Sequence, residues 1–251
     1  MQNTINFYRL PCLVMNILLI NKKNIKANRT IVSGRQFDHL KKVLRVSTGD
    51  RIRVGVIDGL IGIGEVEKFE MDYIMLSISA NSPPPKAIPA TIILSLPRPK
   101  FLKRILQNLA ALGIKDIHII HSQRVEKSYW NTPQLHLSQM NENFILGLEQ
   151  AGDTVVPNVT LHKRFKPFVE DVLPSLMNGQ DAFLAQPRSE RSCPVCINKS
   201  SLLIIGPEGG FIPYEINIFE NIGFQAVSIG DRIMRVEVAI PMLISRLYPG
   251  Q

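Results

Sequence analysis

The sequence predicts an α/β protein in two parts, a barrel of short strands followed by a parallel sheet with crossover helices. Three observations support this prediction. Short apolar stretches separated by turn residues fill positions 15–80, three successive prolines follow at positions 83–85, and strand and helix patterns alternate from residue 88 to residue 251. Such alternation is typical of parallel sheets, because each helix carries the chain back to the start of the next strand.

The composition excludes several other classes of protein. The 251 residues are 45% hydrophobic and 20% charged, which is typical of a globular chain with a buried core. No apolar run reaches about 18 residues, so we expect no membrane-spanning helix. The first residues lack the layout of a signal peptide, and we interpret residues 1–14 as an N-terminal extension or a start-codon artefact before Met15. The expected location is the cytoplasm.

The first part, residues 15–80, is predicted to form the barrel. Strands are expected at 16–20, 30–32, 51–56, 60–68 and 73–78. A short helix is expected over 36–44, where Phe37, Leu40 and Leu44 share one face. Asp58-Gly59, between two of the strands, has the residue types of a hairpin turn. Several short strands with one small helix are typical of a compact barrel.

Positive charge is concentrated in this first part. Residues 1–86 hold 13 Lys/Arg against 7 Asp/Glu, a balance of +6, whereas residues 87–251 hold 16 against 14, a balance of +2. Ten of the basic residues lie between Lys22 and Arg53. Such an excess indicates an anionic partner, either nucleic acid or a membrane surface. A basic face that serves only solubility is the alternative.

The second part follows a proline-rich linker at residues 81–87. Strands are expected at 90–96, 114–120, 181–185, 202–205 and 225–229. Helices are expected at 101–112, 140–148, from Pro213 to Gly223, and at 236–247, where Pro241 should introduce a kink unless the helix begins late. On the first of these helices, Phe101, Ile105, Leu109 and Leu112 are expected to face the core.

Two glycine turns near the C-terminus are the strongest functional signal. GPEGGF (206–211) directly follows one apolar strand, and IGDRIMRVE (229–237) directly follows the next. Open α/β sheets bind their ligands at the carboxyl ends of strands, and glycine lets the main chain approach a ligand closely. The turns lack the Lys-Ser/Thr of a phosphate loop and the spacing of a dinucleotide fingerprint. They indicate a flat, mostly uncharged ligand, with ordinary strand-to-helix turns as the alternative.

These two turns resemble the paired signature of the RsmE family, ribosomal-RNA uridine-N3 methyltransferases of the SPOUT class. The segment HLKKVLRVSTGD (39–50) resembles the PUA-like RNA-binding barrel of the same family. The resemblance extends from about Met15 to the C-terminus. It implies a PUA-like barrel, a C-terminal domain with a deep trefoil knot, and S-adenosyl-L-methionine held in that knot. It also implies a homodimer that acts on small-subunit (16S) ribosomal RNA, in assembled 30S particles.

The resemblance, together with the position of the second turn and the basic charge of the first part, suggests roles for individual residues. Arg235 and Glu237 are the catalytic candidates, the first to stabilise negative charge on the uracil and the second to orient Arg235 or relay a proton. A salt bridge that braces the knot is the alternative for both. The RNA-binding candidates are Arg35, His39, Lys42, Arg45 and Arg51. The cofactor-binding candidates are Leu184, Ile205, Gly206, Pro207, Glu208, Gly209, Gly210, Ile229, Gly230, Arg232, Ile233 and Met234.

Four positions depart from the family pattern, namely Asn108, Ala111, Asp153 and Val236. They motivate a rival hypothesis, a non-catalytic RNA-binding or ribosome-assembly factor with the same fold. Another methylation, such as ribose 2′-O methylation, is a weaker third reading.

The cysteines and the last helix lead to two further expectations. Cys193 and Cys196 have the spacing of a redox pair or of half a zinc site. No second pair or nearby histidine follows, so no metal is expected and we interpret the two cysteines as structural or incidental. Apolar residues of the last helix, Met242, Ile244 and Leu247, are the candidates for a two-fold interface.

Overall fold

The computed structural model describes residues 17–250, which form two compact units. Unit 1 contains the described residues up to Pro84 together with Gly152–Thr154, and unit 2 contains Pro85–Ala151 and the chain from Val155 onward. The division at residues 84 and 85 falls inside the proline-rich segment. The expectations for residues 1–14 and for a start at Met15 lie outside the described residues.

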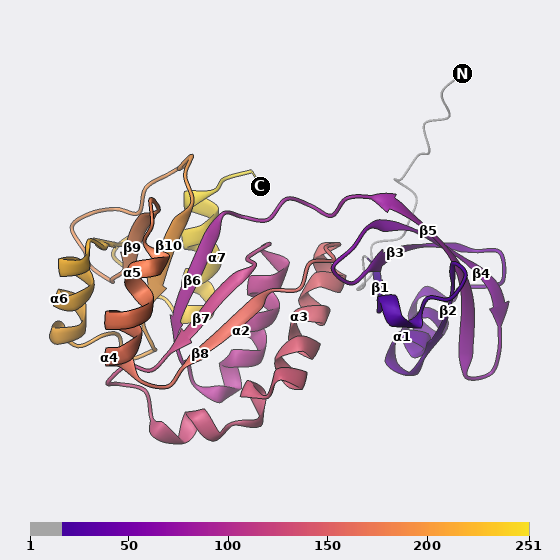
Figure 1. Ribbon diagram of the computed structural model, residues 1–251, viewed down its shortest axis with the longest axis horizontal. Coiled ribbons are helices and arrows are strands. Elements are labelled where there is room, and N and C mark those ends of the chain that lie inside the picture. Colours follow the sequence, from indigo (N-terminus) through magenta and orange to yellow (C-terminus); the bar gives the residue numbers. More distant parts are fainter. Residues whose placement is uncertain (1–16, 251) are drawn as a thin grey trace. The chain divides into compact units, whose positions relative to one another are not determined.

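Unit 1 is built on a five-stranded sheet with the order β1-β3-β4-β5-β2 (Figure 1). β1 (Leu18–Ile20) runs parallel to β3 (Arg51–Val56), and the other neighbours are antiparallel. The other strands are β2 (Arg29–Ser33), β4 (Ile61–Phe69) and β5 (Tyr73–Ser82). Inward-facing residues of these strands form the core of the unit with Phe37 and Leu40.

The helix expected over residues 36–44 is present in a different form. α1 (Gly34–His39) continues directly into a π-helical turn, η3 (Leu40–Leu44), which ends at Arg45 in the left-handed region with φ 51°. Phe37 and Leu40 are buried as expected, and Leu44 packs against the same core. The wider turn thus keeps the three apolar side chains on one face and leaves Arg45 exposed at the end.

β4 and β5 pair with two irregularities, and one of them explains a glycine. The register shifts between Ile61 and Gly62, where a Cβ on Gly62 would lie 1.9 Å from the carbonyl oxygen of Ser79. Only glycine allows the two backbones to approach this closely. β5 also extends to Ser82 because it pairs with Ile61, so the first two residues of the predicted linker belong to a strand.

Unit 2 contains a six-stranded sheet in which all neighbours are parallel, with the order β11-β9-β10-β6-β7-β8. The predicted parallel sheet is therefore confirmed. Its strands are β6 (Ala90–Ser95), β7 (Asp116–Ile120), β8 (Asn158–His162), β9 (Asp181–Ala185), β10 (Ser201–Ile205) and β11 (Gln225–Val227).

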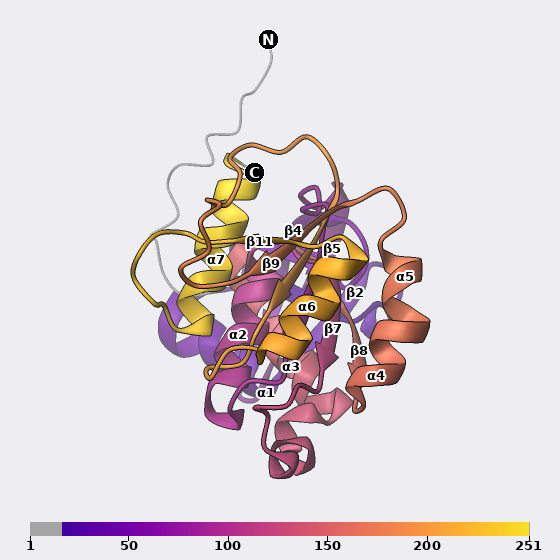
Figure 2. The ribbon, with the colours of Figure 1, turned by 90° about the vertical axis from the view of Figure 1, so that its left-hand side faces the viewer.

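Helices cover both faces of this sheet (Figures 1 and 2). One face is covered by α6 (Pro213–Ile222) and by a continuous helical segment that consists of α4 (Phe165–Pro167), η6 (Phe168–Val172) and α5 (Leu173–Leu176). On the other face α2 (Pro99–Ala111) packs against both α3 (Leu137–Ala151) and α7 (Val236–Leu247). Parallel sheets need this double cover because both of their faces are apolar.

Two helical faces differ from the sequence prediction. α2 begins at Pro99 and buries Leu102, Ile105, Leu106, Leu109 and Ala110, whereas Phe101 and Leu112 are only half-buried. The helix contacts two neighbouring helices, so its buried stripe is wider than one face and turned by one residue. In α7, Ile244 and Leu247 are 1% and 0% exposed inside the chain's own core, so the prediction that they form a two-fold interface is wrong.

Candidate functional site

A cavity opens at the carboxyl edge of the parallel sheet, where β9, β10 and β11 end. Turns that directly follow the three strands form most of its wall, and the start of α7 closes it. The lining residues are Ala185, Gln186, Pro187, Ile205, Gly206, Pro207, Glu208, Gly210, Phe211, Val227, Ser228, Ile229, Gly230, Arg232, Ile233, Met234, Val236, Ala239 and Leu243. This edge is where ligands bind in open α/β sheets.

Ten of the twelve predicted cofactor residues line this cavity, namely Ile205, Gly206, Pro207, Glu208, Gly210, Ile229, Gly230, Arg232, Ile233 and Met234. Leu184 does not, because its side chain is fully buried in β9. Gly209 does not either, because the space beside its Cα is filled by Arg124, whose Cδ would lie 3.2 Å from an added Cβ. The structure brings the two turns together, and their role in cofactor binding stays a prediction.

Sequence reasoning missed the segment that follows β9. Ala185, Gln186 and Pro187 line the cavity because β9 lies between β10 and β11 and ends at the same edge. The predicted strand at 181–185 implied that the residues after it lie at the ligand-binding edge, because parallel strands end on the same edge. The order of the strands, which places them beside the glycine turns, is not visible in the sequence. Apolar side chains and main-chain groups make up most of the wall, with a few polar side chains such as Gln186, Ser228 and Arg232.

The first glycine turn has a defined local cause. The Gly210 amide donates to the Pro207 carbonyl at 2.7 Å, and Gly210 has φ 71°, a conformation that favours glycine. The turn is held further by Glu215, which is 2% exposed at the start of α6. Its Oε2 accepts the Ile212 amide at 3.0 Å, and its Oε1 accepts the Gln123 amide at 2.7 Å. One buried carboxylate therefore connects the loop after β10 to the loop after β7.

The two catalytic candidates lie beside the cavity, and neither lines it. Arg235 is the exposed N-cap residue of α7, and its carbonyl accepts the amides of Val238 and Ala239. Glu237 lies in the first turn, and its Oε2 is buried with no hydrogen-bond partner among residues 17–250. The described part of the chain contains no ion pair between them, so the bracing salt bridge proposed as the alternative is not formed.

The RNA-binding candidates all lie in unit 1 and differ in their ion pairs and exposure. Lys42 pairs with Asp38 at 2.9 Å, and Arg51 pairs with Glu65 at 3.4 Å. Arg35 and Arg45 are exposed, and Arg45 has no ion pair with any residue that the structure describes. His39 is half-buried, and its Nε2 is a buried atom without a hydrogen-bond partner in the described chain. Their contact with RNA stays a prediction.

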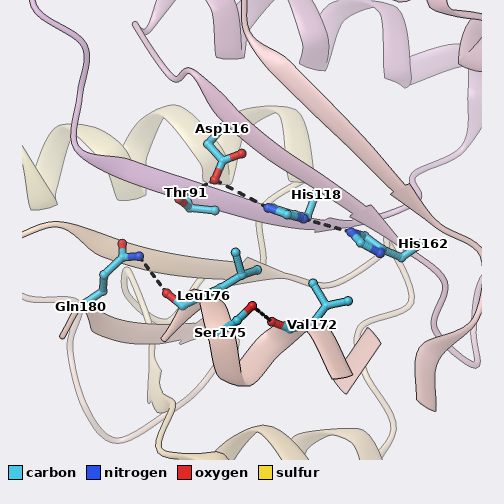
Figure 3. Close-up of polar contacts among 8 residues, drawn as sticks. All are labelled: Thr91, Asp116, His118, His162, Val172, Ser175, Leu176 and Gln180. Carbon is cyan, nitrogen blue, oxygen red and sulfur yellow. Dashed lines mark hydrogen bonds and ion pairs between the residues drawn. The ribbon is translucent and has the colours of Figure 1, made fainter. Parts of the chain in front are cut away.

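A second polar cluster lies on β6, β7 and the edge strand β8 of unit 2 (Figure 3). His118 Nδ1 and His162 Nε2 are 2.9 Å apart and share a hydrogen bond, and Thr91 Oγ1 donates to Asp116 Oδ2 at 2.9 Å. His118 lowers the pKa of the Asp116 carboxyl. Burial first, and then the charge of His118, lowers the pKa of His162 below its ordinary value. The rings of both histidines pack against Phe168.

The stability of the fold should fall as the pH drops below 6.5, the ordinary pKa of a histidine side chain. His162 has a lowered pKa in the folded chain, so near pH 6.5 the unfolded chain binds more protons than the folded one. The free energy of unfolding therefore decreases as pH falls through 6.5. Urea unfolding at pH 7.5 and pH 5.5 should show a smaller decrease for His162→Gln than for wild type. The exposed His136→Gln is the control, and an equal pH dependence in His162→Gln would contradict the prediction.

No group of three or more His, Cys, Asp or Glu side chains among residues 17–250 is arranged to hold a metal ion. Cys193 is buried, Cys196 is exposed, and both are free thiols. Among the described helices, none combines the length and apolar character needed to cross a membrane.

Family models match both units of the chain. Residues 84–248 match the model described as an RNA methyltransferase domain, and residues 32–69 match the model described as an RNA methyltransferase PUA domain. The chain belongs to the RNA methyltransferase family. The resemblance to RsmE proteins seen in the two glycine turns is confirmed.

Relatives of this RNA methyltransferase cover almost all of its length. The chain is 29% identical over 232 residues to ribosomal RNA small subunit methyltransferase E of Treponema pallidum, which covers 90% of this chain and 87% of the relative. It is 24% identical over 227 residues to ribosomal RNA small subunit methyltransferase E 1 of Borreliella burgdorferi, which covers 90% and 94%.

Solved structures show the same fold at lower identity. Ribosomal RNA small subunit methyltransferase E of Neisseria gonorrhoeae, bound to S-adenosyl methionine, superposes with a TM-score of 0.70 at 22% identity over 92% of this chain and 95% of that one. A methyltransferase of Legionella pneumophila in complex with the same cofactor gives 0.71 at 20% identity over 93% and 96%. The fold of this chain is therefore that of these proteins.

Proposed function

We propose that this chain transfers a methyl group from S-adenosyl-L-methionine to N3 of a specific uridine in small-subunit ribosomal RNA. The observation that carries the proposal is the cavity at the carboxyl edge of the parallel sheet, walled by two glycine turns in a chain of the RNA methyltransferase family. The relatives are named for small-subunit ribosomal RNA, which supports the same class of substrate here.

The residues around the cavity fit this cofactor. Apolar side chains and main-chain groups suit a flat adenine ring, and Gly206, Gly210 and Gly230 leave the backbone accessible. We assign adenosyl and methionine binding to Ile205–Gly210 and Ile229–Met234, with Ala185–Pro187 as an added wall. When bound, the cofactor supplies an electrophilic sulfonium methyl group.

The RNA side of the reaction needs help from this chain. N3 of uridine carries a proton and is a poor nucleophile until that proton leaves. The site must align N3 with the methyl group, accept the proton and stabilise negative charge on the uracil. We assign the last task to the guanidinium of Arg235, which stays charged at any working pH. The unpartnered Oε2 of Glu237 is a candidate acceptor for the proton.

The four departures from the family pattern differ in how strongly they count against this proposal. α2 starts at the carboxyl edge of β6 and returns to the opposite edge of the sheet before β7. Asn108 and Ala111 lie in its last turns and do not line the cavity. Val236 is the departure that lines it, and Asp153 belongs to unit 1. The non-catalytic alternative therefore rests mainly on one buried apolar side chain.

The finer architecture is also part of the proposal. We assign the chain from β10 to α7 to a SPOUT-type trefoil knot, supported by the return of α7 to α2 after β11 at the far end of the sheet. We assign RNA docking to the basic surface of unit 1, and a homodimer to unit 2. Met242, which is half-buried, stays an interface candidate, and Val238, which is 45% exposed on α7, replaces the buried Ile244 and Leu247. Light scattering on the pure protein measures the dimer directly.

Mass spectrometry tests the function. Small subunits from cells that lack this gene should lack one N3-methyluridine, and the purified protein with S-adenosylmethionine should restore it. Assembled subunits and bare RNA should be offered separately, because the target can require the folded particle. Methylation of neither would leave the assembly-factor hypothesis, and a ribose methyl group in the digest would replace uridine N3 by a 2′-hydroxyl.

A further inference from the structure

We propose that unit 2 carries its own contact surface for the phosphodiester backbone of RNA, next to the cofactor turn. This strand-end surface consists of Arg98, Lys100, Arg124 and Lys127. The inference rests on the proposed function, because it places part of the RNA substrate beside the cavity. It concerns residues outside those predicted from the sequence, which lie in unit 1.

The sheet order brings these residues to the cavity edge. β10, β6 and β7 are adjacent parallel strands, so their carboxyl ends lie side by side. The cofactor turn follows β10 at Ile205, Arg98 and Lys100 follow the end of β6 at Ser95, and Arg124 and Lys127 follow the end of β7 at Ile120. Residues from three separate parts of the sequence therefore meet at one edge.

Specific contacts hold the three loops together. The backbone amide of Arg98 donates to Glu208 Oε1 at 3.1 Å, which connects the loop after β6 to the cofactor turn. The Arg124 guanidinium donates to the carbonyl of Gly209, and its aliphatic part lies beside the Cα of that glycine. The neighbouring Gln123 amide is held by the buried Glu215. The loop after β7 is thus positioned by main-chain contacts rather than by chance packing.

The cations on this surface are not neutralised. All four side chains are exposed. None of them forms an ion pair with a carboxylate in the part of the chain that the structure describes. Three carboxylates lie nearby and accept hydrogen bonds from neutral donors, Glu208 from the Arg98 amide, Glu215 from the Gln123 amide and Glu126 from the hydroxyl of Tyr129 at 2.9 Å. Four cations without an ion pair, on two adjacent loops and the first turn of α2, match an anion with several charges.

An RNA backbone fits this pattern better than a single small anion. The four residues are spread along two loops and the start of α2, as is needed to contact successive phosphates. Such contacts orient a nucleic acid without reading its sequence. On this surface they would fix the RNA strand so that the target nucleotide reaches the cavity, while unit 1 binds another part of the same RNA.

The salt dependence of RNA binding tests the surface. Each lost phosphate contact lowers the slope of log K against log salt by about 0.7–0.9. For the full-length Arg98→Gln/Arg124→Gln double variant on small-subunit ribosomal RNA transcribed in vitro, we expect a slope smaller by about 1.4–1.8, so that the affinity ratio between 50 and 200 mM salt shrinks by a factor of about 7 to 12. Fluorescence anisotropy measures this ratio.

A matched control removes the same charge from the opposite edge of the sheet. Lys86 and Lys199 are exposed and precede β6 and β10, and the Lys86→Gln/Lys199→Gln variant should keep the wild-type slope. Arg124→Lys should also keep most of it, because the charge remains. Should the arginine double variant melt early, Arg98→Gln alone retains the backbone bond to Glu208 and should still lower the slope by about 0.7–0.9.

The outcomes separate this inference from the proposed function. A wild-type slope in both arginine variants would overturn the strand-end surface while methyl transfer by the wild type still stands. Loss of S-adenosylmethionine affinity in calorimetry with an unchanged RNA slope would also overturn it, because the cations would then serve the cofactor. Failure of the wild type to methylate any RNA would instead count against the proposed function.

Discussion

Arg235→Ala should reduce methyl transfer by a factor of about 100 to 1,000, the usual cost of losing one donor aimed at charge that develops in the transition state. Arg235 caps α7 through its backbone carbonyl, which alanine also provides, so the helix and the cavity wall should remain. The expected pattern is an unchanged affinity for S-adenosylmethionine in calorimetry together with a large fall in single-turnover rate on assembled small subunits.

Two variants make this result specific. Arg191 is also exposed, and its guanidinium pairs with Gln225 at 2.6 Å outside the cavity lining, so Arg191→Ala should turn over normally. Glu237→Ala should lose less activity than Arg235→Ala. Normal turnover in Arg235→Ala would remove this residue from the mechanism without questioning the enzyme.

Gly230→Val should weaken cofactor binding. Gly230 lines the cavity and has φ 125°, a conformation that a β-branched residue avoids. Holding such a residue in a strained backbone conformation costs about 1–3 kcal/mol. If the turn relaxes to avoid this strain, binding must restore the strained conformation, and the affinity falls about 5- to 150-fold. No heavy atom lies within 4 Å of an added Cβ, so the effect comes from the backbone and not from a clash.

Gly179→Val is the matched control for that variant. Gly179 also has a positive φ, 75°, and also has open space around its Cα, but it lies in the turn before β9 and not at the cavity. Both variants should be destabilised to a similar degree in thermal unfolding, and only Gly230→Val should lose the heat of cofactor binding. Equal cofactor affinity in the two would show that the second turn does not hold the ligand.

The regular elements could be predicted wherever local pattern and environment agree. β6, β9 and β10 are short apolar runs, and they are buried on both faces as such runs predict. β8 was missed because Asn158–His162 is an edge strand whose side chains alternate weakly between polar and apolar. The stretch from Phe165 to Leu176 was missed because Pro167 and Pro174 obscure its helical pattern, and it forms one continuous helical segment with a π-helical middle.

The candidate site could be predicted where one local turn carries it. Both glycine turns were located because their residue types define them without knowledge of neighbours. Ala185–Pro187, Arg98 and Arg124 could not be found in this way, because only the order of strands in the sheet brings them to the same edge. Ile244 and Leu247 were assigned to an interface because apolarity alone does not tell a chain's own core from a partner's surface.

The three residues Gly152–Thr154 have a consequence for anyone who wishes to recombine this protein. They belong to unit 1, where the Thr154 hydroxyl donates to the Gly59 carbonyl at 2.6 Å and its carbonyl accepts the Asp58 amide at 2.9 Å. If the gene were divided at the proline linker, neither fragment would match a complete unit. The N-terminal fragment would lack residues 152–154, and the C-terminal fragment would contain them. When unit 1 is exchanged between relatives, residues 152–154 should be transferred together with the barrel, so that two separate segments of the gene are replaced.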